Sequence, residues 1–137
     1  MPARITDEIK GILRKQPFTV LVTKHYETGE PYAIVVGKTP GPKVIPEHED
    51  KIFFCRWIMK TTKKNLERDP WIMVLAVDHE EFKSFRIFGK GKFISLEEAK
   101  TEFGVDFPKP PRKEVLVVEI DRIQYGYYGD KTNQWLE

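Results

Sequence analysis

The chain has 137 residues, of which 40% are hydrophobic and 32% are charged, and its formal net charge is +2. This composition excludes an intrinsically disordered chain. The small net charge argues against nonspecific binding to nucleic acid. No apolar run approaches the roughly 20 residues of a membrane-spanning helix. The first fifteen residues also lack the apolar core of a signal peptide. We therefore expect one domain over residues 1–137, in the cytoplasm and with no membrane partner.

The first part of the chain predicts one helix followed by a hairpin. Thr6 is the expected N-cap of an amphipathic helix over residues 6–15, where isoleucines and a leucine recur on one face. β-Branched residues predict strands over 18–24 and 32–38, and the turn residues between them make the pair a hairpin. Residues 39–50 contain three prolines, which predicts a long loop.

The second part predicts further strands separated by short helices. Apolar strands are expected over 51–57 and 71–77, with a helix over 60–68 between them. The next strand, 82–93, holds two glycines that predict a bulge, and a Ser-Leu-Glu-Glu capping box then opens another helix. The last clear strand is 115–120. About six strands with mostly short connections predict a mainly β fold, a small antiparallel barrel with two or three peripheral short helices.

The cysteine and the histidines point to no metal or disulfide chemistry. Cys55 is the single cysteine, so an intramolecular disulfide is impossible, and its place in an apolar strand predicts a buried, inert thiol. His25, His48 and His79 are spread over separate segments and match no spacing typical of a metal site. We expect no bound metal.

The most unusual segment is WIMKTTKKNLERDP, from Trp57 to Pro70, which packs three lysines and two threonines into five consecutive positions. Thr61 or Thr62 is the expected N-cap of its helix, and the lysines then oppose the helix dipole. An anion at this end would reverse that effect, because N–H groups, hydroxyls and ammonium groups would converge on it, and a phosphate dianion fits best. The alternative is a solvated charge run, whose dipole penalty is screened by salt.

The order of these features resembles a known family. The segments MKTTKKNLERDPWIMVLAV, SFRIFGKGKFIS and VLVVEIDRIQYGYYG follow one another as in the pyridoxamine 5′-phosphate oxidase-like flavoproteins, the FMN-binding split-barrel family. The resemblance covers nearly the whole chain and is most specific in the pattern K-T-x-x-x-N-L-x-x-D-P, which begins at Lys60. It implies a six-stranded antiparallel split β-barrel, a homodimer with two FMN sites at the subunit interface, and an FMN-dependent oxidoreductase or electron carrier.

The resemblance also implies which residues bind the FMN. Basic and hydroxyl residues after the third strand hold the phosphate in this family. In this chain they are Lys60, Thr61, Thr62 and Lys63. The strand before the long loop lies along the flavin ring in the family. In this chain the corresponding residues are Val35, Val36, Gly37 and Lys38. Aromatic residues of a partner subunit often cover the ring, and the candidates are Trp57, Tyr127 and Trp135.

The chain departs from true pyridoxamine phosphate oxidases in two respects. Its tail, YGYYGDKTNQWLE, has no arginine, whereas those enzymes carry an arginine-rich substrate signature near the C-terminus. The position of the usual basic residue, eight before Pro70, is occupied by Thr62, so Lys60 is the first choice to supply the phosphate charge. The first departure argues against vitamin B6 oxidation.

Three classes of function remain open from the sequence. The first is an FMN-binding oxidoreductase or electron carrier with a small-molecule redox partner, in which no acid–base residue stands out. The second is a binding module without catalysis, which holds a phosphorylated ligand or a deazaflavin. The third is a small nucleic-acid-binding barrel, with aromatic residues stacking on bases beside Lys90 and Lys92, and the balanced charge argues against it.

Overall fold

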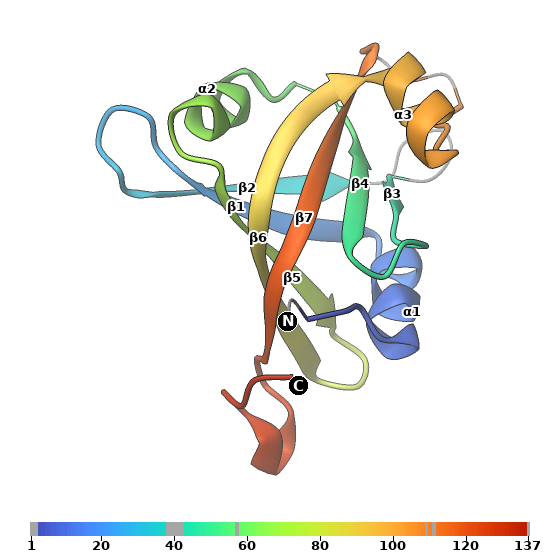
Figure 1. Ribbon diagram of the computed structural model, residues 1–137. Helices are drawn as coiled ribbons and strands as arrows, with labels where there is room; N and C mark the ends of the chain where they lie inside the picture. Colours follow the sequence, from blue (N-terminus) through green and yellow to red (C-terminus); the bar gives the residue numbers. More distant parts are fainter. Residues whose placement is uncertain (1–2, 38–42, 57, 109, 111, 137) are drawn as a thin grey trace.

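The computed structural model describes residues 3–37, 43–56, 58–108, 110 and 112–136. In this part of the chain, seven strands form one antiparallel sheet, and helices lie around it (Figure 1). No helix among the described residues is long and apolar enough to cross a membrane. The elements in chain order are α1 (Asp7–Lys15), β1 (Phe18–Lys24), β2 (Pro31–Gly37), β3 (Val44–Ile45), β4 (Lys51–Cys55), α2 (Lys60–Arg68), β5 (Trp71–Asp78), β6 (Lys83–Ser95), α3 (Leu96–Phe103), β7 (Glu114–Tyr125) and the 3-10 helix η1 (Gly129–Lys131).

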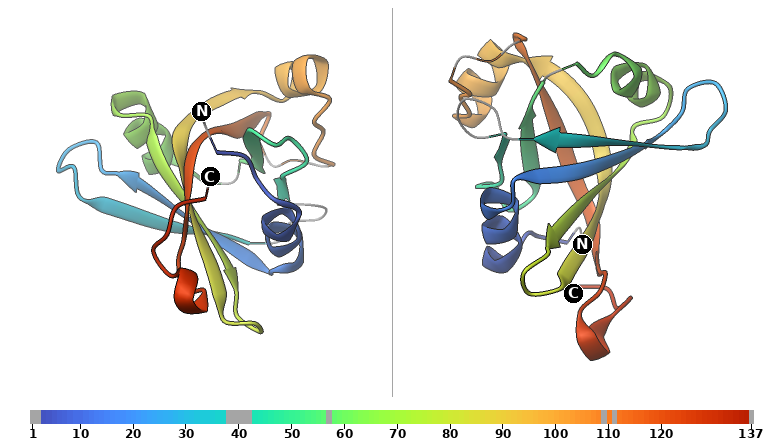
Figure 2. Two further views of the ribbon diagram at one scale, coloured as in Figure 1. Left: turned by 60° about the horizontal axis from the view of Figure 1, so that its bottom comes forward. Right: turned by 180° about the vertical axis from the view of Figure 1, so that it is seen from behind.

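The strand order explains why the barrel is split. The sheet runs β2-β1-β5-β6-β7-β4-β3, so β2 and β3 form its two edges. The strands curl around a common interior in both views (Figure 2), which confirms the mainly β split-barrel architecture. The expected number of six strands was wrong by one. Within the segment expected to be a loop, Val44 and Ile45 pair with Phe54 and Phe53 of β4, and this two-residue strand covers an edge that would otherwise be unpaired.

Two of the three α-helices begin where their capping residues predict. The Thr6 hydroxyl accepts a hydrogen bond from the Ile9 N–H at 3.3 Å at the start of α1. The Ser95 hydroxyl accepts one from the Glu98 N–H at 3.0 Å at the start of α3. Gly104 ends α3 with φ of +68°, a left-handed conformation that favours glycine. Both caps confirm the sequence prediction.

The expected bulge lies in the middle of β6. The register against β7 shifts between Phe88 and Gly89, and a Cβ on Gly89 would lie 2.1 Å from the backbone oxygen of Glu119. Only glycine therefore fits this close approach of two strands. β7 also continues to Tyr125, beyond the predicted end of the last strand, and the bent pair β6–β7 crosses the whole barrel (Figure 1).

The core consists of two clusters, one on each side of β4. The larger fills the barrel between α1, α2 and the inner face of the sheet, and includes Ile52 and Phe54. The smaller lies under α3 and includes Phe53, Cys55 and Phe107. Because alternate residues of β4 face opposite ways, this strand is buried on both sides. The Cys55 thiol is buried as predicted, and burial raises its pKa.

Candidate functional site

The first turn of α2 has no side-chain cap. The helix begins at Lys60 with Met59 at the N-cap position, φ −131°, and no side-chain hydrogen bond there. The prediction of Thr61 or Thr62 as the cap was wrong. Met59 is buried in the core, and its carbonyl accepts the Lys63 N–H at 2.9 Å, so the turn closes before the threonines. The N–H groups at this end therefore face no capping side chain, which is the arrangement that binds anions.

The four residues expected to hold a phosphate lie in this turn but have different surroundings. Lys60 is exposed and makes no ion pair with another described residue, whereas Thr61 is half-buried. Thr62 is only 1% exposed. The Lys63 ammonium lies 3.1 Å and 3.3 Å from the two carboxylate oxygens of Glu114. Lys60 and the backbone N–H groups are thus the most accessible donors, and phosphate binding by the four residues stays a prediction.

A second cation beside this turn was missed by the sequence analysis. Nη1 of Arg56 donates a hydrogen bond to Oε1 of Glu114, the same carboxylate that pairs with Lys63. The Arg56 side chain is 13% exposed, and its Nε is buried without a hydrogen-bond partner among the described residues. Its guanidinium also lies over the Phe93 ring, 5.3 Å from the centroid. Glu114 is 58 residues from Arg56, so no local pattern predicts this contact.

The residues expected beside a flavin ring lie on β2, an edge strand. Val35 is 65% exposed and points away from the core, Val36 is buried, and Gly37 ends the strand in an exposed position. Lys38 and Trp57, the other two candidates, lie outside the described residues. As the edge of the sheet, β2 pairs on one side only, with β1. Its other side carries backbone N–H and C=O groups available to a ligand.

The two groups of candidates belong to neighbouring elements. α2 packs mainly against β1 and β6, and lies near the end of the sheet where the β1–β2 hairpin turns (Figures 1 and 2). Gly37 pairs with Phe18 at the far end of that hairpin. A ligand that used both groups would therefore extend along the hairpin.

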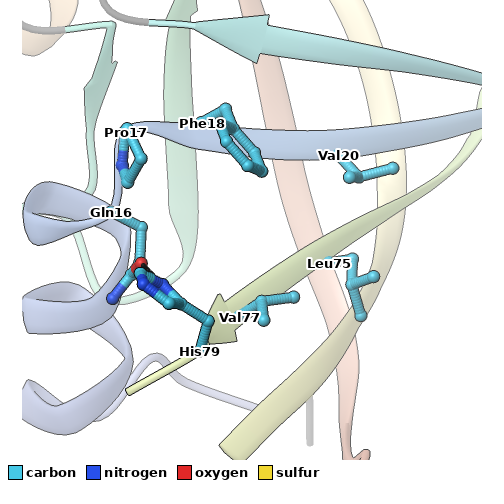
Figure 3. Close-up of a pocket in the computed structure, with 7 residues that line it drawn as sticks. All are labelled: Gln16, Pro17, Phe18, Val20, Leu75, Val77 and His79. Atoms are coloured by element: carbon cyan, nitrogen blue, oxygen red, sulfur yellow. Dashed lines mark hydrogen bonds between the residues drawn. The ribbon is translucent and has the colours of Figure 1, made fainter. Parts of the chain in front are cut away.

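The outer face of β1 and β5 carries a mainly apolar pocket of about 310 Å³ (Figure 3). His79 Nδ1 lies 2.9 Å from Gln16 Oε1, and because a carbonyl oxygen only accepts, Nδ1 carries the proton. These two side chains are the polar part of the lining. The pocket is lined by Gln16, Pro17, Phe18, Val20, Leu75, Val77 and His79. Val20 pairs with Val35 on one side and Leu75 on the other, so the apolar face continues to the edge of β2.

The aromatic candidates of the tail lie close to the same sheet. Tyr127 is exposed. Trp135 stacks on its own chain, with its ring centroid 5.8 Å from that of Phe88 and the Arg122 guanidinium 4.4 Å above its ring. Whether either ring covers a ligand of a partner subunit stays a prediction. Among the described residues, no cluster of histidine, cysteine and carboxylate side chains forms a metal site.

Comparisons with known proteins identify relatives of this fold. HupZ from Group A Streptococcus is 20% identical, with 94% of this chain and 98% of that chain covered and a TM-score of 0.70. A pyridoxamine 5′-phosphate oxidase-related, FMN binding protein from Nostoc punctiforme is 14% identical, with 86% and 80% covered and a TM-score of 0.60. An F420 reductase is 10% identical, with 88% and 98% covered and a TM-score of 0.59.

Sequence comparisons give a family assignment that agrees with these folds. The comparison with curated protein sequences finds no match. The family model described as pyridoxamine 5′-phosphate oxidase matches residues 5–127, which is most of the chain. The resemblance inferred from the sequence is thereby confirmed, and the chain belongs to the pyridoxamine 5′-phosphate oxidase family.

Proposed function

We propose that the protein is an FMN-binding flavoprotein that acts as an oxidoreductase or electron carrier, with FMN at the interface of a homodimer. The observation that carries this proposal is the uncapped first turn of α2, flanked by Lys60 and by the Arg56–Glu114–Lys63 contacts. In this family context, a phosphate monoester is the anion that such a turn would take. The FMN binding protein from Nostoc supports FMN as the cofactor.

The donors at this turn suit a phosphate group. Backbone N–H groups, the Thr61 hydroxyl and the Lys60 ammonium are all donors, and a phosphate offers only acceptor oxygens near neutral pH. Thr62 is buried, so we assign it to the support of the turn rather than to a direct contact. Lys63 shares its charge with Glu114 and contributes less than a free lysine.

The edge of β2 suits the polar rim of a flavin ring. Those backbone groups of the segment Val35–Gly37 that point to the open side of β2 would meet the ring, while the Val36 side chain remains in the core. Lys38 and Trp57 complete this proposed set. FMN, when bound, supplies the redox chemistry, and the chain binds and orients it. We propose a small molecule as the redox partner.

The outer face of the sheet supports the homodimer. Phe18, which is 56% exposed, lines the pocket of Figure 3, and Val35, which is 65% exposed, pairs with Val20 of that pocket. An exposed apolar face of this kind marks an interaction site in soluble proteins. A second copy of the chain would cover it, and the partner would then lie beside β2, where the flavin ring is proposed.

The test is the cofactor of the purified protein. We expect a yellow protein that releases FMN on denaturation, and an apoprotein that binds FMN at least about tenfold more tightly than riboflavin, since hydrogen bonds to a charged group contribute about 1.5–3 kcal/mol each. A colourless protein that takes up no added FMN would contradict the proposal. Bound FMN that no redox partner reduces or oxidises would favour a binding module.

A deazaflavin is the second candidate, because the F420 reductase shares the fold. Titration of the apoprotein with F420 and with FMN separates the two cofactors. Preference for F420 would reassign the cofactor. Uptake of single-stranded oligonucleotide in place of either would favour the nucleic-acid-binding barrel.

A further inference from the structure

Three charged side chains meet beside the first turn of α2. The carboxylate of Glu114, at the start of β7, accepts from Arg56 Nη1 and lies 3.1 Å from Lys63 Nζ. Arg56 lies three residues before the N-cap position, and Lys63 is the fourth residue of the helix. We call these three residues the charge cluster. Both cations sit against the Phe93 ring, 5.3 Å and 6.0 Å from its centroid, which fixes them on one side of the turn.

The charge cluster carries one more positive charge than negative. Glu114 is the carboxylate paired with both cations in the described structure. The Arg56 side chain is 13% exposed, and its buried Nε has no hydrogen-bond partner among the described residues. A largely buried cation that shares one carboxylate is incompletely compensated, and burial makes such a charge costly. An added anion would balance it.

A cavity adjoins two members of the charge cluster. It has a volume of about 240 Å³ and is lined by Lys63, Leu66, Glu67, Gly91, Lys92, Phe93 and Glu114. It adjoins the charge cluster on the side of α2 that faces β6. Lys63 is the fourth residue of α2, so it connects this cavity to the first turn of the helix, where the uncapped N–H groups lie.

We propose that Arg56 and Lys63, held in place by Glu114, form the cationic wall of the phosphate site at the start of α2. Arg56 thereby adds to the positive charge that Lys60 brings to this site, and Glu114 is a positioning residue that also limits the net charge of the wall. This inference rests on the proposed function, because it assigns residues to the phosphate of the FMN.

Changing the charge of the wall in both directions gives the decisive experiment. Arg56→Gln lowers the net charge of the cluster from +1 to 0, and Glu114→Gln raises it to +2, with little change in size. We expect Arg56→Gln to weaken FMN binding about tenfold, and Glu114→Gln to strengthen it about threefold at low salt, with riboflavin affinity within about twofold for both. Flavin fluorescence quenching measures both affinities. The gain in Glu114→Gln should shrink in 0.5 M salt, since a charge effect is screened.

Lys90→Met is the matched control. It also removes one positive charge from β6, but Lys90 is exposed, makes no ion pair with another described residue and is not among the residues that line the cavity. We expect its FMN affinity to stay within about twofold of the unchanged protein, because exposed charges are well screened. Thermal unfolding of each variant shows that it is folded, and the Glu114→Gln arm suffices if Arg56→Gln does not fold.

The outcomes separate the two proposals. The inference is supported if the unchanged protein prefers FMN to riboflavin and if the two variants change the FMN affinity in opposite directions. If both variants lose affinity for FMN and for riboflavin to the same extent, the charge cluster is a structural support. The inference is then overturned, while the proposed function stands. A selective loss of FMN in Glu114→Gln also overturns it. An unchanged protein that binds neither flavin overturns the proposed function and the inference together.

Discussion

The buried side-chain amide of Asn65 donates to the Thr23 hydroxyl, with 2.9 Å between Nδ2 and Oγ1. Its Oδ1 accepts the backbone N–H of Tyr26 at 2.8 Å. A single amide therefore ties the middle of α2 to β1 and to the turn of the first hairpin. This asparagine belongs to the pattern by which the chain resembles its family, and its contacts show that it positions the helix whose first turn is the candidate anion site.

We expect Asn65→Ala to destabilise the protein by about 2–3 kcal/mol, because two hydrogen bonds are lost and their partners are left unpaired in or near the core. Thr23→Val, which removes one of the two bonds, should cost about 1 kcal/mol. Urea denaturation followed by tryptophan fluorescence measures both. The control is Glu67→Ala on the exposed side of α2, with an expected change below about 0.5 kcal/mol. Equal losses in Asn65→Ala and Glu67→Ala would contradict this role.

The two strands that meet at Gly89 leave no room for a side chain. In Gly89→Ala the new Cβ would lie 2.1 Å from the Glu119 carbonyl oxygen, so β6 and β7 must separate. We expect a loss of about 1–3 kcal/mol in the free energy of unfolding. Gly11→Ala is the opposite case, since Gly11 lies in α1 with open space around it, and alanine should stabilise that helix by about 0.5–1 kcal/mol. Thermal unfolding of the two variants should show shifts of opposite sign.

The proposed dimer predicts that a charge on the outer face separates the subunits. Val35→Glu places a carboxylate on the exposed apolar face beside Val20, where a second copy would bury it. Light scattering after gel filtration should change from the mass of a dimer to that of a monomer of 16.1 kDa. Thr101→Glu adds the same charge on the exposed side of α3 and should stay dimeric. A monomeric unchanged protein would exclude this interface.

The carboxylate of Asp69 predicts a small dependence of stability on pH. The Trp71 N–H donates to Asp69 Oδ1 at 3.0 Å, and this bond, with Lys24 nearby, lowers the pKa of the Asp69 carboxyl below its usual value of 3.8. The folded state therefore favours the charged form, and its contribution is complete above about pH 4 and lost as the pH falls through the lowered pKa.

We accordingly expect Asp69→Asn to be less stable than the unchanged protein at pH 7, by no more than about 1 kcal/mol because the group is exposed. The difference should shrink as the pH falls below about 4 and through the lowered pKa, because the carboxyl then becomes neutral in the folded chain as well. Urea denaturation at several pH values measures it. A difference that is independent of pH would show that the charge of Asp69 contributes nothing.

Local chemistry made much of the fold predictable from the sequence. Thr6 and Ser95 cap their helices as expected, and β-branched residues form the expected strands, because these preferences depend on neighbours a few residues away. The bounds of α2 also agree with the expected helix over 60–68, but the same reasoning assigned its N-cap to the wrong residue. The burial of Met59 in the core outweighed the capping preference of the threonines, and burial depends on residues that are distant in the chain.

The sequence by itself determined the mainly β class, the capped helices and the family, since each depends on local preference or on the order of motifs along the chain. Only the tertiary structure decided that Asn65 supports α2 from within, and that Glu114 holds Arg56 and Lys63 together beside its first turn. Glu114 follows Arg56 by 58 residues, so its carboxylate reaches Arg56 only because β7 pairs with β4 and with β6. The pairing of distant strands, which no local pattern encodes, thus set the charge of the candidate site.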